Sequence, residues 1–351
     1  MNMLRPILVL AGSLLLAASA SAQSPPTPPG ETPAAKAAPA KPKPKPHEPA
    51  KPHEPTKSPA AAESPAPAAA APDDPKVDLV YGAYQRGLYK TAFDLATARA
   101  QAGDVTAMTM LGELYANELG VKRDYAKAVE WYKRASDGGD REAMFALAMM
   151  RLDGRGGPVD RQDAVRLLAS AAKLGEPKAA YNLALLYLDG QTLPQDLKRA
   201  AELLRMAADA GNPEAQYALA TFYKEGTGVE KDVEKSVRLL QAASLADNVD
   251  AEVEYAIALY NGTGTPKNEP AAVALLRKAA RQNSPIAQNR LARVLVTGQG
   301  APMDKIEGLK WHLVAKTAGK GDLFLDEAFA QLSPEDRAKV EAVAKHWLGL
   351  K

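Results

Sequence analysis

The sequence predicts an all-α protein: a right-handed α-solenoid of helix-turn-helix repeats. Three series of residues predict this fold, because each recurs every 36 residues without a gap. The series are Ala107, Ala143, Ala179, Ala215, Ala251 and Ala287; Leu111, Leu147, Leu183, Leu219, Tyr255 and Leu291; and Ala135, Ala171, Ala207, Ala243, Ala279 and Ala315. They define six repeats, at 105–140, 141–176, 177–212, 213–248, 249–284 and 285–320.

Residues 1–22 have the pattern of a secretory signal peptide. Arg5 precedes an apolar stretch at 7–18, and the small residues of 20–22 are suited to cleavage after Ala22. The alternative is a retained membrane anchor, but the apolar stretch is shorter than the roughly 20 residues needed to span a bilayer. We therefore expect a periplasmic or secreted protein, presumed to come from a Gram-negative bacterium, that is not inserted in a membrane after removal of the signal.

Residues 23–75 are predicted to be a disordered linker rich in proline, alanine and lysine. This segment contains 17 prolines and 14 alanines, but no Leu, Ile, Val, Met, Phe, Tyr or Trp. Without such side chains it cannot bury apolar surface. A proline-rich chain extends by about 3.1 Å per residue, so the segment would act as a semi-rigid tether.

Each repeat is expected to contain two helices. In the first repeat, Ala107, Leu111 and Tyr115 share one helical face, and Ala128 and Tyr132 share another. Glycine at 154, 190, 226, 262 and 298 is predicted to end the first helix of later repeats. Six residues further on, an aspartate or asparagine is expected to cap the second helix. The predicted capping residues are Asp124, Asp160, Asp196, Asp232, Asn268 and Asp304.

The boundaries between repeats also carry helix-ending and helix-starting residues. A residue suited to a left-handed backbone ends each unit, and proline follows two positions later in three of them. The unit ends are Gly139, Gly175, Gly211, Asp247, Asn283 and Gly319, and the prolines are Pro177, Pro213 and Pro285. Before the array, 76–104 is predicted to be a partial leading repeat. After it, 321–351 is predicted to be a helical cap, with helices at 323–330 and from Pro334 towards Trp347.

No residue pattern indicates catalysis, a metal site or a cofactor. The chain has no cysteine, and its 44 basic and 42 acidic residues are nearly balanced, which disfavours nucleic acid as a partner. His312 occupies the repeat position of Leu168 and Leu204, so we interpret it as a packing residue. His346 falls in the predicted cap. The recurring Gly-x-Gly pairs separate helices and do not follow a strand, unlike phosphate-binding loops.

Several motifs together resemble the Sel-one-like repeat family, which is related to the tetratricopeptide repeats. They are Leu-Gly-x-x-Tyr at 111–115, Gly-x-Gly-Val at 226–229, and Asp124 followed by Ala128, Trp131 and Tyr132. The resemblance covers about 105–320. Repeat 3 departs from the family pattern, because it has Thr192 and Leu193 in place of Gly-Val. Repeat 5 departs as well, with Thr265-Pro266 after its second glycine. The loops of these two repeats are therefore expected to differ in shape. The resemblance implies an adaptor or regulatory scaffold without enzymatic activity.

The resemblance also suggests where a protein partner binds. Two positions of the first helix point away from the packed side, and in the tetratricopeptide family such positions line a groove. In repeats 2 to 5 they are mostly apolar, which suits an extended or helical segment. The predicted groove residues are Phe145, Met149, Tyr181, Leu185, Tyr217, Thr221, Val253 and Ile257. The alternative is that these side chains only pack between neighbouring first helices.

The sequence therefore favours a non-enzymatic envelope protein that binds other proteins through the surface of its repeats. A structural or cell-wall-associated spacer is the alternative function. A hydrolase is a further alternative, although it would need polar side chains that converge in a pocket, and the sequence indicates no such set.

Overall fold

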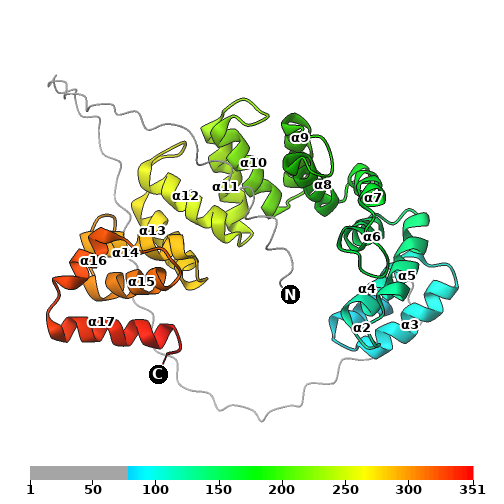
Figure 1. Ribbon diagram of the computed structural model, residues 1–351, viewed down its shortest axis with the longest axis horizontal. Helices are drawn as coiled ribbons and strands as arrows, with labels where there is room; N and C mark the ends of the chain where they lie inside the picture. Colours follow the sequence, from blue (N-terminus) through cyan, green and yellow to red (C-terminus); the bar gives the residue numbers. More distant parts are fainter. Residues whose placement is uncertain (1–77, 351) are drawn as a thin grey trace, which may run out of the picture. The chain divides into compact units, whose positions relative to one another are not determined.

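The computed structural model describes residues 78–350, and every regular element in this range is a helix (Figure 1). The predicted signal peptide and linker lie outside the described residues. The leading and closing helices are α2 (Leu79–Gln85), α3 (Tyr89–Gln101), α16 (Leu323–Ala330) and α17 (Pro334–Trp347). The repeats contain α4 (Val105–Asn117), α5 (Tyr125–Asp137), α6 (Arg141–Asp153), α7 (Arg161–Lys173), α8 (Pro177–Asp189), α9 (Leu197–Asp209), α10 (Pro213–Glu225), α11 (Val233–Leu245), α12 (Val249–Asn261), α13 (Glu269–Arg281), α14 (Pro285–Thr297) and α15 (Lys305–Thr317).

The helices pack mainly against their neighbours in the chain. Within each repeat the first helix packs on the second, as α4 does on α5, and the second packs on the first helix of the next repeat. This pattern defines an α-solenoid, so the predicted fold class is confirmed. No helix in the described range is long and apolar enough to cross a membrane.

Side-chain caps start the helices where the sequence predicts them. The carboxylate of Asp124 accepts a hydrogen bond of 3.0 Å from the backbone N–H of Lys127, and the corresponding residue of every later repeat makes the same contact. The carboxylates and amides at these positions therefore satisfy helix N-termini.

Left-handed residues end the helices. Gly154, Gly190, Gly226, Gly262 and Gly298 have φ between 67° and 80°, and each is the C-cap of a first helix. In the first repeat the same position is Glu118, which adopts φ 60° despite its side chain. The repeat ends are left-handed too, including the two that are not glycine, Asp247 and Asn283.

The second glycine of each Gly-x-Gly pair lies close to the preceding repeat. A Cβ atom on Gly156 would stand 2.3 Å from the carbonyl oxygen of Tyr125, and one on Gly228 would stand 2.3 Å from that of Leu197. Repeat 3 has Thr192 at this position and does not adopt a positive φ there, so its loop differs as expected. Gly264 of repeat 5 keeps φ 68°, so the predicted difference is absent at that residue.

The core consists of the periodic small and aliphatic side chains. All six alanines of the series that begins at Ala135 are fully buried, and those of the series that begins at Ala107 are 0–3% exposed. Alanine at these positions allows close approach of the helices, while larger residues such as Leu168 and Leu204 fill the space between them.

The closing helices are fixed to the last repeat by both apolar and polar contacts. Leu325 of α16 and Val340 of α17 are fully buried in the core cluster that contains Leu309 of α15. His312 is also fully buried, which agrees with its interpretation as a packing residue. Its Nε2 lies 2.9 Å from Oδ1 of Asp326 on α16. A leucine at this position could not make that polar contact.

Candidate protein-binding surface

The eight predicted groove residues form one row along the first helices of repeats 2 to 5, which we call the first-helix row. Each helix supplies two of them: α6, α8, α10 and α12 in turn. Tyr181 and Val253 are buried, with exposed fractions of 8% and 4%. The other six are half-buried: Phe145, Met149, Leu185, Tyr217, Thr221 and Ile257.

Packing accounts for part of this row. Tyr181 belongs to the core cluster of the N-terminal repeats, and Val253 belongs to that of the C-terminal repeats. Leu185 and Ile257 contact these same clusters yet retain partial exposure. The accessible part of the row therefore consists of its half-buried members, whereas Tyr181 and Val253 belong to the core.

Acidic side chains of the following repeat lie near each of the two tyrosines. Burial, together with the charge of Glu214, raises the pKa of Tyr181 to about 12. Burial, together with the charges of Asp250 and Glu254, raises the pKa of Tyr217 to about 12. Both phenols therefore stay neutral at physiological pH and can act as hydrogen-bond donors.

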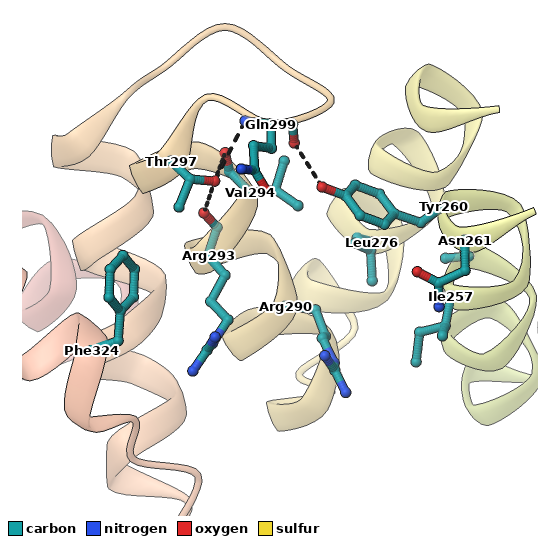
Figure 2. Close-up of a pocket in the computed structure, with 11 residues that line it drawn as sticks. Ile257, Tyr260, Asn261, Leu276, Arg290, Arg293, Val294, Thr297, Gln299 and Phe324 are labelled. Carbon is teal, nitrogen blue, oxygen red and sulfur yellow. Dashed lines mark hydrogen bonds between the residues drawn. The ribbon is translucent and has the colours of Figure 1, made fainter. Parts of the chain in front are cut away.

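The row ends at a pocket between α12, α13, α14 and α16 (Figure 2). The pocket has a volume of about 370 Å³. Ile257 is the only member of the first-helix row that lines it, and Leu276 and Val294 add apolar surface. The remaining lining residues are Ala256, Tyr260, Asn261, Arg290, Arg293, Thr297, Gln299 and Phe324.

Hydrogen bonds fix one end of this pocket. The hydroxyl of Tyr260 donates to the backbone oxygen of Gln299 at 3.3 Å, linking α12 to the loop that follows α14. The hydroxyl of Thr297 donates to the backbone oxygen of Arg293 at 2.8 Å, and the N–H of Gln299 donates to that hydroxyl at 3.4 Å (Figure 2).

Two arginines provide the charge of the pocket. Arg293 donates two hydrogen bonds to Asp322, and its guanidinium lies 5.6 Å from the ring centroid of Phe324. Arg290 is exposed and has neither an ion pair nor a hydrogen bond from its side chain within the described range. Arg293 lies 36 residues after Ile257, so the repeat spacing places it next to the row on the following first helix. Phe324 has no such repeat position, because it lies outside the repeats.

No catalytic cluster was expected from the sequence, and the two histidines of residues 78–350 lie apart from the row. His312 is buried between α15 and α16, whereas His346 is exposed on α17. In the described part of the chain no three His, Asp or Glu side chains are placed to hold a metal ion.

The fold and this surface define the class of protein: an α-solenoid of two-helix repeats with a row of partly exposed side chains on its first helices. The family model of the Sel1 repeat matches six consecutive segments, at 105–140, 141–176, 177–212, 213–248, 249–284 and 285–320. The chain therefore belongs to the Sel1 repeat family, the family its sequence resembles. Sel1 repeats are generally non-catalytic scaffolds that bind other proteins.

Two solved structures similar to this chain are Sel1-type solenoids. A Sel1 repeat protein from Oxalobacter formigenes is 26% identical, with a TM-score of 0.61; the match covers 68% of this chain and 98% of that one. A protective antigen of uropathogenic Escherichia coli strains, with the same repeat fold, is 24% identical, with a TM-score of 0.53; the match covers 74% of this chain and 64% of that one. No curated protein matches the chain by sequence.

Proposed function

We propose that this protein is a non-enzymatic scaffold or regulator of the bacterial cell envelope that holds a partner protein along the first-helix row. The observation that carries the proposal is the half-burial of Leu185, Tyr217, Thr221 and Ile257 on three consecutive first helices. Half-buried side chains are held in place by the core, so they present a preformed surface whose ordering costs little on binding.

The chemistry of the row favours an extended or helical segment of another protein. Leu185 and Ile257 offer apolar contacts, whereas the phenol of Tyr217 offers a hydrogen-bond donor among acidic neighbours. A groove of this kind recognises a segment through a series of side chains, one or two per repeat. No set of convergent polar groups in the described residues supports hydrolysis better than binding.

The periplasmic or secreted location is part of the proposal and rests on the signal-peptide pattern of residues 1–22. Fractionation of cells that express the full chain and a chain lacking 1–22 tests it. The full chain is expected outside the cytoplasm and the truncated chain inside it. Equal distribution of the two would contradict the proposed location.

A variant with Leu185→Glu and Tyr217→Ala tests the binding surface. Tyr181 is kept, because its burial makes it part of the core. The matched control carries Met206→Glu and Tyr81→Ala, at exposed positions away from the row. Tagged wild-type protein, control and variant are isolated from cells, and the proteins that copurify are quantified.

We expect one or a few specific proteins with the wild type and the control, and their loss with the row variant. The variant should keep the helical circular dichroism signal of the control and a cooperative melting transition, at a lower temperature because both side chains contact the core. Retention of every copurifying protein by the row variant would contradict the proposal. Unfolding of the variant would contradict it too, because the two residues would then be core residues.

A further inference from the structure

The pocket at the end of the first-helix row borders an exposed apolar edge of the cap. Phe324 is 44% exposed, and its neighbour Leu323 is 82% exposed. Both lie at the start of α16, and Phe324 lines the pocket across from Ile257 and Tyr260 of α12 (Figure 2). An apolar side chain that enters between Ile257 and Phe324 would remove part of this apolar surface from water.

The charges around the pocket are unbalanced. Its lining includes two arginines and no acidic residue. Carboxylates on the surrounding segments are already held by other cations: Asp322 by Arg293 at 2.5 and 2.9 Å, Glu254 by Lys224 of the preceding repeat at 2.9 Å, and Glu269 by Lys267 at 2.7 Å. The guanidinium of Arg290 therefore has no carboxylate partner in the described part of the chain.

The polar groups of the pocket suit a peptide. The side-chain amide of Asn261 makes no hydrogen bond within residues 78–350, and that of Gln299 makes none there either. Both line the pocket, so they can bond to the backbone of a bound segment. A volume of about 370 Å³ is near the lower end of the range for ligand pockets, and it suits one large side chain rather than a whole helix.

We propose that this pocket binds an acidic segment of the partner protein. In that segment an aspartate or glutamate side chain pairs with Arg290, and an adjacent large apolar side chain enters between Ile257 and Phe324. The proposal rests on the proposed function and specifies one site on the partner-binding surface. Arginine suits this role because its planar guanidinium donates two parallel hydrogen bonds to a carboxylate.

A displayed library of random peptides, selected on the full chain without residues 1–22, tests the proposal. Peptides that the wild type enriches are then measured against Arg290→Glu and Phe324→Ala variants. The control is Arg161→Glu, which reverses an exposed arginine at the start of α7. Circular dichroism melting verifies that each variant keeps the wild-type fold.

We expect enriched peptides to carry an acidic residue beside a large apolar residue. Arg290→Glu should weaken their binding by about tenfold or more, as for a lost charge-assisted contact, whereas Arg161→Glu should not. A peptide with lysine in place of the acidic residue should bind Arg290→Glu better than it binds the wild type. Phe324→Ala should weaken binding of peptides with either charge.

The proposal would be overturned if no peptides were enriched, or if the enriched peptides showed no preference for acidic residues. It would also be overturned if the enriched peptides bound Arg290→Glu as tightly as the wild type. Such an outcome leaves the proposed function intact if the Leu185→Glu, Tyr217→Ala variant still loses its copurifying proteins. If that variant keeps all its copurifying proteins while the peptides behave as expected, binding along the first-helix row is refuted. The pocket then remains as a binding site by itself.

Discussion

Arg293 and Asp322 join the last repeat to the closing helices through a two-point ion pair. The guanidinium Nε lies 2.5 Å from Oδ2 of Asp322, and a terminal nitrogen lies 2.9 Å from Oδ1. Asp322 is also the N-cap of α16, since its carboxylate accepts from the N–H groups of Phe324 and Leu325. The same contact neutralises one of the two arginines of the pocket and leaves Arg290 available.

Replacement of Asp322 separates these two roles. Burial opposes ionisation of Asp322, but hydrogen bonds from Arg293 and Asn289 outweigh it and hold its pKa below the ordinary aspartate value. Asp322→Ala should lower the free energy of unfolding by about 2 kcal/mol, because both the cap and the ion pair are lost. Asp322→Asn keeps a capping oxygen and should cost about half as much. Urea denaturation measures the free energy of unfolding of the two variants. Equal decreases in the two would show that the capping oxygen does not contribute.

Gly228 and Gly211 differ in what surrounds them, although both have positive φ. A Cβ atom on Gly211 would meet nothing within 4 Å, whereas one on Gly228 would stand 2.3 Å from the carbonyl oxygen of Leu197. Gly211→Ala should cost about 1 kcal/mol through left-handed backbone strain alone. Gly228→Ala should cost at least about 1 kcal/mol more, because the two repeats must move apart. Equal midpoints of urea unfolding for the two variants would refute the close approach at Gly228.

The raised pKa values of Tyr181 and Tyr217 predict a loss of stability in alkali. Burial, followed by the charge of the neighbouring carboxylates, favours the neutral phenols in the folded protein. Their contribution is complete below pH 10, the ordinary tyrosine pKa, and is lost as the pH rises to about 12. The free energy of unfolding should therefore fall over this range in wild type and fall less steeply with Tyr181→Phe and Tyr217→Phe together. The same slope in both proteins would contradict the assigned burial.

Most of the fold could be predicted because each 36-residue sequence repeat forms one two-helix unit of the structure. The Asp124 series caps second helices, and the Gly154 series ends first helices, because these local conformations depend on the residue itself. Glu118 shows the limit of this rule: it takes a left-handed conformation that its side chain disfavours, so the repeat imposes the turn.

Contacts between different elements could not be read from the period. Glu252 is fully buried at a position where the first two repeats have Met108 and Met144, and its carboxylate lies 2.6 Å from the ammonium group of Lys278 on α13. Sequence alone gives no sign that this particular glutamate faces inward. A buried carboxylate needs such a partner, and only the packing of α12 against α13 supplies it.

The candidate site could be predicted in part. The position of each residue within its repeat located the first-helix row. It could not show that Tyr181 and Val253 are buried while their neighbours remain accessible. Phe324 closes the pocket from the cap, where the period no longer applies. Its position depends on the docking of α16 on α14 and α15, a tertiary contact without a sequence pattern.

Photocrosslinking in cells tests the binding of a partner along the row most directly. A photoreactive amino acid is placed at Tyr217 or Leu185 in the row, and at Met206 or Tyr81 away from it. We expect the same partner adduct from both row positions and none from either control position. Absence of an adduct from the row, or an equal adduct from the controls, would contradict binding along the row.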